Sequence, residues 1–256
     1  MYYEQSTNQF LEHLELPPDY RVDGVICCGT IYEEKFLGVL SDTLKNMKIT
    51  AKPTNLAHNF LRYVYEIDVD DKRLWFMTGY GGAMLSEYLH WACQFGSRKN
   101  ILIGSCGGLK KGMQPTDFLV PTSSYGQESS VRMYNRQSPN QPANRTLADS
   151  LVNRLKGTDV KIWQGPIITC QAMMAETWDD IQNWSREGYF GVEMESSTLF
   201  AVSNHFNVPS AATLFVGDNL IEQHTNLSKS YAEQTHIRRA RRLSQFKATL
   251  EELLTS

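Results

Sequence analysis

Apolar residues follow two patterns along the first half of the chain: short continuous runs and repeats at helical spacing. Residues 23–29 (DGVICCG) form a short apolar run that ends on glycine, which predicts a strand followed by a turn. The next segment repeats apolar side chains at helical spacing, at Phe36, Leu37, Leu40 and Leu44. Residues 60–82 predict two strands around an Asp-rich turn, residues 84–96 an amphipathic helix, and residues 100–108 (NILIGSCGG) a strand that runs into a Gly-rich turn.

The second half continues the alternation of strand and helix. Strands are predicted over residues 117–125 and 161–170, and the polar stretch 126–145 between them is the best candidate for a mobile surface loop. The other predicted elements are helices over 147–155 and 191–206, a buried strand over 210–219 and a helix over the last 28 residues. This order predicts an α/β fold: a single domain over residues 1–256 with a twisted mixed, mostly parallel central sheet flanked by helices.

The charge balance of the chain is close to neutral. It holds 25 Lys+Arg and 28 Asp+Glu, a formal net charge of −3, and so lacks the basic footprint of a nucleic-acid-binding protein. The cluster RRARR at 238–242 has no interleaved aromatic residues, which favours a solvated helix face over a nucleic-acid contact. With 41% hydrophobic and 21% charged residues, the chain has the composition of a globular protein with a sizeable core.

The cysteines and the N-terminus indicate the compartment. The five cysteines (Cys27, Cys28, Cys93, Cys106 and Cys170) are scattered through apolar stretches, without a CxxC pair or Cys/His ligand spacing. This pattern predicts reduced thiols in a cytoplasmic protein, with no metal site and no cofactor. The start of the chain is unlike a signal peptide, and no run of about 18 apolar residues occurs. No membrane partner is therefore expected.

Three segments, in their order and spacing, carry a resemblance to a known family. They are ICCG (26–29), ILIGSCGGLKKGMQPTDFLVPT (101–122) and GVEMESSTLFAVSNHFNVPSAATLFVGDN (191–219). Together with HLEL near the start they span about residues 13–255. They resemble the nucleoside phosphorylase and nucleosidase superfamily of the purine and uridine phosphorylase type, including its methylthioadenosine nucleosidase-like branch. The resemblance implies cleavage of the N-glycosidic bond of a small-molecule nucleoside.

The chemistry of that bond explains why carboxylates stand in these motifs. As the bond breaks, the sugar gains oxocarbenium character and the base gains negative charge, so a site must hold the ribose and protonate the base. The resemblance assigns Glu195, the second Glu of VEME, to the two ribose hydroxyls, and Met194 to the sugar face. It places Val192 and Glu193 at the edge of the base. For the glutamates, the alternative is a solvated helix start favoured by the helix dipole.

Asp218, in GDN at the end of an apolar strand, matches the family's aspartate that protonates or hydrogen-bonds N7 of a purine. Such an acid must keep its proton near neutral pH, which a dry pocket favours, whereas the alternative role is ordinary turn chemistry. Because uridine-type members replace this residue, its presence implies a purine-like base. Met173 falls where family members place an aromatic side chain that stacks on the base. It would suit an unusual base or serve as core filler.

His13 implies an oligomer. It lies in HLEL, 16 residues before Gly29, and resembles the histidine that hexameric family members lend across a subunit contact to the 5′-hydroxyl. The match implies a homo-oligomer, a dimer or a hexamer, with residues 1–22 at a subunit contact. A surface histidine is the alternative.

The pocket for the nucleophile departs from the phosphorylase pattern. The resemblance places Gly29, Gly104 and Ser105 in this pocket. The positions expected to carry arginine hold Glu33 or Glu34, Asn59 and Leu102. A site with a carboxylate and no arginine holds a phosphate dianion poorly. The arginine expected about 13 residues after Asp218 is also absent. That position holds Tyr231, and the nearest basic residues are Lys229 and Arg238.

These departures favour water over phosphate as the co-substrate. The glutamate-rich turn GTIYEEKFL is similar to that of the nucleosidase branch, with Glu34 at the position of the water-activating base and Glu33 as its substitute. We therefore expect hydrolysis of a purine-like ribonucleoside. One alternative is a nucleoside phosphorylase whose phosphate is held by other arginines, with Arg62 and Arg132 as candidates. The other is a non-catalytic nucleoside-binding protein.

Overall fold

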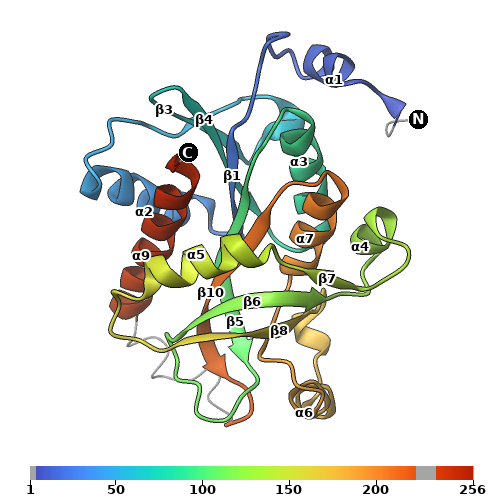
Figure 1. The fold of residues 1–256 in the computed structure, drawn as a ribbon, viewed down its shortest axis with the longest axis vertical. Helices are drawn as coiled ribbons and strands as arrows, with labels where there is room; N and C mark the ends of the chain where they lie inside the picture. Colours follow the sequence, from blue (N-terminus) through green and yellow to red (C-terminus); the bar gives the residue numbers. More distant parts are fainter. Residues whose placement is uncertain (1–3, 223–234, 256) are drawn as a thin grey trace.

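The apolar runs of the sequence become the strands of one twisted sheet with helices on both sides (Figure 1). The computed structural model describes residues 4–222 and 235–255. The strands are β1 (Gly24–Gly29), β2 (Thr54–Asn55), β3 (Val64–Val69), β4 (Lys72–Gly79), β5 (Asn100–Gly108), β6 (Phe118–Tyr125), β7 (Asn140–Pro142), β8 (Ile162–Thr169), β9 (Gly191–Glu193) and β10 (Ser210–Asn219). The α-helices are α1 (Thr7–His13), α2 (Glu33–Asn46), α3 (Gly82–Gln94), α4 (Ser129–Tyr134), α5 (Arg145–Leu155), α6 (Trp178–Arg186), α7 (Ser196–His205) and α9 (Thr235–Leu254), and the short 3₁₀ turns are η2 (Asn59–Leu61) and η3 (Met173–Ala175).

The strand order explains how distant motifs meet. Along the sheet it is β10-β6-β8-β9-β5-β1-β4-β3-β2, with β7 beside β6 and a second pairing between β10 and β5. That second pairing closes β5, β10, β6, β8 and β9 into a ring, from which β1, β4, β3 and β2 extend. Five of the ten described pairings are parallel. The α/β class and the mixed, mostly parallel sheet are confirmed, because the longest ladders, β5–β10 and β6–β8, are parallel.

Two apolar layers sandwich the sheet. Because side chains alternate along a strand, Val25 and Cys27 of β1 face one layer while Ile26 and Cys28 face the other. Helices α1, α3 and α7 bury their apolar residues in the first layer, and α2, α5 and α9 bury theirs in the second. All five cysteines are free thiols, and four of them are buried.

The prediction of a mobile loop over residues 126–145 was wrong. This stretch contains α4 and β7 and leads into α5, which Asn144 caps by accepting a 2.9 Å hydrogen bond from the Leu147 amide. Glu128 accepts hydrogen bonds from the hydroxyls of Ser197 and Thr198 in the first turn of α7. The polar composition of the stretch therefore reflects helix capping and side-chain contacts with α7.

Two further expectations differ from the structure. The helix predicted over 191–206 begins only at Ser196, because residues 191–193 pair as β9 with both β5 and β8. The arginine cluster 238–242 is not a uniformly solvated face, because α9 packs against α2 and α5 and leaves Arg238 only 5% exposed. The three residues of β9 are too short a run to reveal a strand beside a helix.

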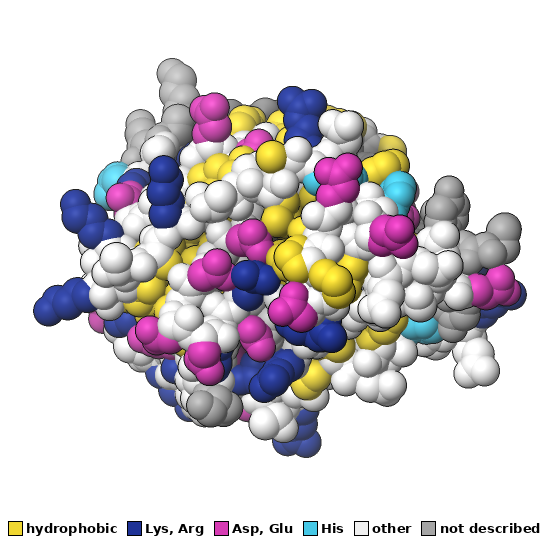
Figure 2. All heavy atoms as spheres, turned by 90° about the horizontal axis from the view of Figure 1, so that it is seen from above, with side chains coloured by type: hydrophobic (Ala, Val, Ile, Leu, Met, Phe, Trp, Pro, Cys, Tyr) yellow, Lys and Arg dark blue, Asp and Glu magenta, His cyan; other side chains and the backbone are white. Residues whose placement is uncertain are grey.

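The surface carries charges of both signs. Acidic and basic side chains intermingle on the face seen in Figure 2, in keeping with the near-neutral balance of the sequence. Among the described residues, no helix has the length and apolar character needed to cross a membrane. The homo-oligomer and the cytoplasmic location stay predictions.

Candidate active site

The parallel strands β1, β4, β5 and β10 end at one edge of the sheet. Gly29 pairs with Gly79 and Asp218 pairs with Gly107, so the ICCG, GSCGG and GDN segments meet there. In α/β proteins, ligands bind outside the carboxyl ends of parallel strands. The residues predicted from the three motifs therefore converge on the edge where a ligand is expected.

Glu195 is the buried carboxylate at this edge. It is 6% exposed, and its Oε1 accepts a hydrogen bond of 2.7 Å from the backbone amide of Gly81. The carboxylate lies over Gly29, where an added Cβ atom would collide with it. Gly81 has a φ of +83°, a conformation that glycine adopts far more readily than other residues. Both glycines are therefore needed to seat the carboxylate.

The surroundings of Glu195 favour its protonated form. Burial, followed by the negative charge of Glu193, raises the pKa of Glu195 to about 8, against the lowering effect of the Gly81 amide. Hydroxyl groups that donate to a carboxylate favour its ionised form. Glu195 is thus set to release a proton when hydroxyl donors arrive.

Glu193 is engaged by the protein itself. Its Oε2 accepts hydrogen bonds of 2.8 Å from the amides of Glu195 and Ser196, and its Oε1 accepts one of 2.6 Å from the Thr169 hydroxyl. Burial raises the pKa of Glu193 as well. The side chain anchors the start of α7 and so positions Glu195. The place of Glu193 at the edge of a base stays a prediction, and the helix start is buried rather than solvated.

Gln171 joins two walls of the site and was not foreseen from the sequence. Its Oε1 accepts a 3.0 Å hydrogen bond from the Gly82 amide, and its Nε2 donates a 2.7 Å bond to the carbonyl of Met194. The side chain therefore fixes the start of α3 against the residue that precedes Glu195. Met194 is half-buried at this edge, and its packing on a sugar stays a prediction.

Asp218 lies at the end of β10 on the same edge. It is 7% exposed and directly follows a bulge between Val216 and Asp218. Asn219 holds the turn that comes next, since its Nδ2 donates to the Met113 carbonyl at 2.9 Å and its Oδ1 accepts from the Glu222 amide at 3.1 Å. The polar end of the strand is thereby fixed in place.

A second carboxylate, Glu176, stands near Asp218 and was missed in the sequence. It directly follows η3 and is half-buried. The pKa of Glu176 is raised to about 6, mainly by burial. A hydrogen bond with Cys170 opposes this rise, and the charges of Asp218 and Asp180 add to it. In the sequence it is one acid among several in a polar segment, with no spacing that marks it.

Val192 and Met173 take different places on the side expected for the base. Val192 is buried and shares the space over Gly107 with Leu220. Met173 opens η3 and is 44% exposed, which speaks against the core-filler alternative. Contact of either residue with a base stays a prediction.

The side expected for the nucleophile contains an exposed hydroxyl. Ser105 is exposed in the otherwise buried strand β5, and Gly104 beside it is buried. Glu33 accepts a 2.7 Å hydrogen bond from the Tyr65 hydroxyl, and Glu34 is exposed on the first turn of α2. Glu33 is therefore tied to β3, which leaves Glu34 as the freer of the two carboxylates.

The positions considered for a phosphate-binding arginine lie in different environments. Leu102 is 1% exposed and belongs to the apolar layer on the α3 side, so this position faces the core. Asn59 is exposed on η2, Arg62 is exposed directly after it, and Arg132 is exposed on α4. Tyr231 and Lys229 lie outside the described residues.

His13 packs among aromatic rings away from the strand ends. Its ring centroid is 5.3 Å from that of Phe60 and 6.4 Å from that of His58. Phe60 in turn packs against Trp91, which lies nine residues along α3 from Gly82, or about 13 Å by helical rise. Its role at a neighbouring subunit stays a prediction.

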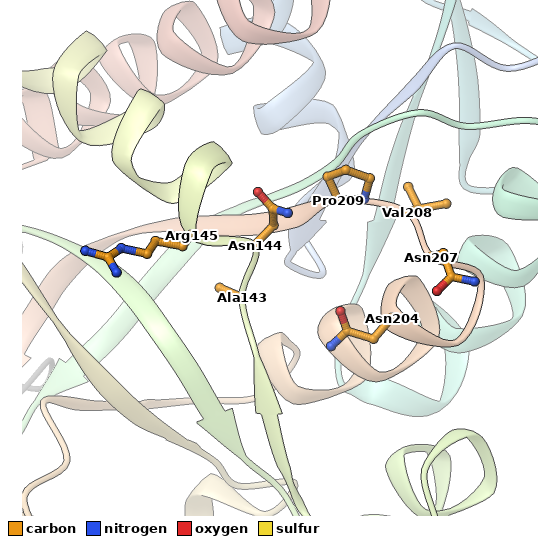
Figure 3. A pocket seen from close by; sticks show the side chains of 7 residues that line it. All are labelled: Ala143, Asn144, Arg145, Asn204, Asn207, Val208 and Pro209. Carbon is orange, nitrogen blue, oxygen red and sulfur yellow. The ribbon is translucent and has the colours of Figure 1, made fainter.

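A separate cavity of about 330 Å³ lies away from this edge (Figure 3). It is lined by Ala143, Asn144, Arg145, Asn204, Asn207, Val208 and Pro209. Pro209 directly precedes β10, so the cavity is at the opposite end of this strand from Asp218. In the described part of the chain, no three His, Cys, Asp or Glu side chains gather as metal ligands.

The sequence matches a known family and several known proteins. A family model described as the phosphorylase superfamily matches residues 25–254. A DeoD-type purine nucleoside phosphorylase from Clostridium novyi is 26% identical over 148 residues, which are 56% of this chain and 63% of that protein. A guanosine phosphorylase from Halorubrum lacusprofundi is 28% identical over 119 residues, which are 46% of this chain and 49% of that protein. A DeoD-type enzyme from Clostridium beijerinckii is 26% identical over 155 residues, 56% of this chain and 62% of its own length.

Proposed function

Because the chain belongs to the phosphorylase superfamily, we propose that it cleaves the N-glycosidic bond of a purine ribonucleoside with phosphate as the nucleophile. The names of similar proteins, purine nucleoside phosphorylase and guanosine phosphorylase, support both the reaction and the class of base. These alignments cover only 63% and 49% of the two relatives, so the activity is argued here from the site itself.

The seating of Glu195 carries the proposal. A carboxylate that is 6% exposed is stable at a strand end only with dedicated partners, and Gly29, Gly81 and Glu193 provide the space and the anchoring. Two vicinal ribose hydroxyls match the two oxygens of such a group. Their hydrogen bonds would draw it to the ionised form and fix the sugar as positive charge develops at the anomeric carbon.

Asp218 supplies the proton in this proposal. The base leaves with negative charge on the purine ring, and a carboxylic acid within reach of N7 neutralises that charge as the bond breaks. Asp218 is 7% exposed at the same edge as Glu195, which suits an acid that must hold its proton until the transition state. Glu176 stands close enough to Asp218 for the two carboxyl groups to interact electrostatically.

Phosphate replaces water as the preferred nucleophile in view of two findings. The curated relatives named above are phosphorylases, and none of their names describes a hydrolase. In addition, Glu33 already accepts a hydrogen bond from the Tyr65 hydroxyl and Glu34 is exposed to solvent, so neither is a buried, unengaged carboxylate of the kind expected to activate a water molecule. The earlier expectation of hydrolysis therefore becomes the second outcome of the test.

Product analysis tests the proposal. Purified protein is incubated with inosine, guanosine, adenosine and uridine, with and without inorganic phosphate, and the free base and the sugar product are identified. We expect ribose 1-phosphate from a purine nucleoside only when phosphate is present. Free ribose formed without phosphate would establish a hydrolase, and nucleoside binding without any product would establish a binding protein.

A further inference from the structure

Helix α9 runs antiparallel to β5 and is anchored to it at two levels. Near its C-terminus, Glu252 Oε1 lies 2.9 Å from Lys99 Nζ, just before β5 begins. Farther back, Gln245 Nε2 donates a 3.1 Å hydrogen bond to the Gly104 carbonyl. Each earlier residue of α9 therefore lies about 1.5 Å closer to the carboxyl end of β5. The N-terminal half of α9 thus extends alongside Ser105 and beyond.

Arg242 lies one turn before Gln245, at the level of Ser105. Its guanidinium carbon is 5.2 Å from the ring centroids of both Phe36 and Phe215. Phe215 is the register partner of Ser105 between β10 and β5, so both side chains project from the same face of the sheet. Cation–π contacts with the two rings therefore hold the guanidinium on the face of the sheet from which Ser105 projects.

The charge of Arg242 also acts on the Cys28 thiol near the end of β1. Burial raises the pKa of the Cys28 thiol, and the charge of Arg242 opposes this rise. Cys28 directly precedes Gly29, the first residue predicted for the nucleophile pocket. The guanidinium is therefore close enough to the end of β1 for its charge to act there.

Two more cations join Arg242 at this corner. Arg238 lies two turns before Gln245 on the same face of α9 and is 5% exposed. Lys35 is in the first turn of α2, and burial together with the charges of Arg242 and Arg238 lowers the pKa of this lysine. Three positive side chains within reach of one another repel, and a bound dianion turns that repulsion into attraction.

We propose that Arg242, Arg238 and Lys35, with the Ser105 hydroxyl, hold the phosphate dianion of the nucleophile pocket. This inference rests on the proposed function, since it identifies the residues that bind its second substrate. The positive charge comes from α9 and from Lys35, two residues after Glu33. It replaces the arginines that were expected at the positions now held by Glu33, Asn59 and Leu102. Guanidinium groups suit the task because they form paired hydrogen bonds with phosphate oxygens.

The test varies phosphate at saturating nucleoside for the wild type, Arg242→Gln, Arg238→Gln and Lys35→Gln. We expect the KM for phosphate to rise at least about tenfold in each variant, with the KM for nucleoside changed less than about threefold. Arg239→Gln is the matched control, because Arg239 is on the same helix but pairs with Asp42 at the surface. Lys35 is exposed, so its variant tests the site even if an arginine variant fails to fold.

Binding without turnover provides a second readout. Inorganic phosphate alone should raise the Tm of the wild type and of Arg239→Gln, and this shift should shrink in the three site variants. Adenosine 5′-monophosphate is the comparison ligand. If only the nucleotide raises the Tm, and the site variants abolish that rise, then the cations hold the 5′-phosphate of a substrate and the inference is wrong.

The outcomes separate this inference from the proposed function. If the wild type needs phosphate but Lys35→Gln and the arginine variants keep the wild-type KM for phosphate, the inference is wrong and the phosphorylase stands. If the wild type cleaves nucleosides at the same rate without phosphate, the proposed function fails and the inference with it. A selective rise in the phosphate KM supports both.

Discussion

The two ends of the candidate site are built in different ways. At the proposed ribose end, Glu195 is held by the backbone amide of Gly81 and by the neighbouring carboxylate of Glu193, and Gly29 leaves space for its side chain. At the proposed nucleophile end, the positive charge comes from long side chains of α2 and α9. The first arrangement tolerates little displacement, whereas the second distributes charge over several side chains, so that the loss of one leaves the others in place. We therefore expect single substitutions to be far more damaging at the ribose and base end than at the nucleophile end.

The largest effect is expected from Asp218→Asn. An amide cannot deliver a proton to the leaving base, so kcat with inosine or adenosine should fall by about 10²- to 10⁴-fold. Steady-state kinetics measure this directly, and an unchanged KM for nucleoside serves as the control for folding. Turnover equal to that of the wild type would remove Asp218 from the mechanism.

Glu195→Gln should have the next largest effect. Losing the charge-assisted hydrogen bonds to the ribose costs about 1.5–3 kcal/mol, which lowers kcat/KM by about 10- to 100-fold. In the wild type, the KM for nucleoside should fall as the pH rises toward 8, because the ionised carboxylate accepts the hydroxyls. This dependence should weaken in Glu195→Gln.

The same residue links stability to pH. Because the folded chain raises the pKa of Glu195 to about 8, it binds more protons than the unfolded chain between the ordinary Glu range and pH 8. The free energy of unfolding should therefore decrease as the pH rises through that window. Denaturation at several pH values should give a shallower decrease for Glu195→Gln, although Glu193 still contributes. An identical slope in both proteins would contradict the burial of an ionisable Glu195.

Two glycine variants distinguish the close approach of Glu195 to Gly29 from a general effect of adding a methyl group. Gly29→Ala places a methyl group against the Glu195 carboxylate and should lower kcat/KM by up to about a hundredfold. Gly38→Ala, in α2, meets nothing within 4 Å and should keep full activity while stabilising the fold by up to about 1 kcal/mol. Equal activity of the two variants would show that the close approach at Gly29 is unimportant.

The smallest effect is expected from Glu176→Gln. Glu176 changes its charge near pH 6 and glutamine does not, so an inflection of the pH–rate profile near pH 6 should be lost in the variant. At neutral pH the loss of rate should be only a few-fold. If the profile of kcat against pH is the same as that of the wild type, Glu176 has no influence on the reaction.

The same contrast between the two ends explains what the sequence revealed. Strands β1, β5 and β10 are apolar runs that end in glycine or polar residues, and Glu195 and Asp218 lie within them or just before a helix. Local patterns of this kind carry their own signal. Gln171 and Arg242 act through partners that are far away in the chain, such as Gly82 and Phe36, and no periodicity marks them. The arginine cluster was even assigned to a solvated face, since helical spacing alone does not reveal which side packs on a neighbour.

The origin of the oxygen on the sugar tests the central claim most directly. Cleavage of a purine nucleoside is run in ¹⁸O-labelled water with unlabelled phosphate, and the sugar product is analysed by mass spectrometry. We expect ribose 1-phosphate without ¹⁸O, because the oxygen bonded to the anomeric carbon comes from phosphate. Free ribose as the first sugar product, formed without ribose 1-phosphate, would show that water is the nucleophile and would contradict the account.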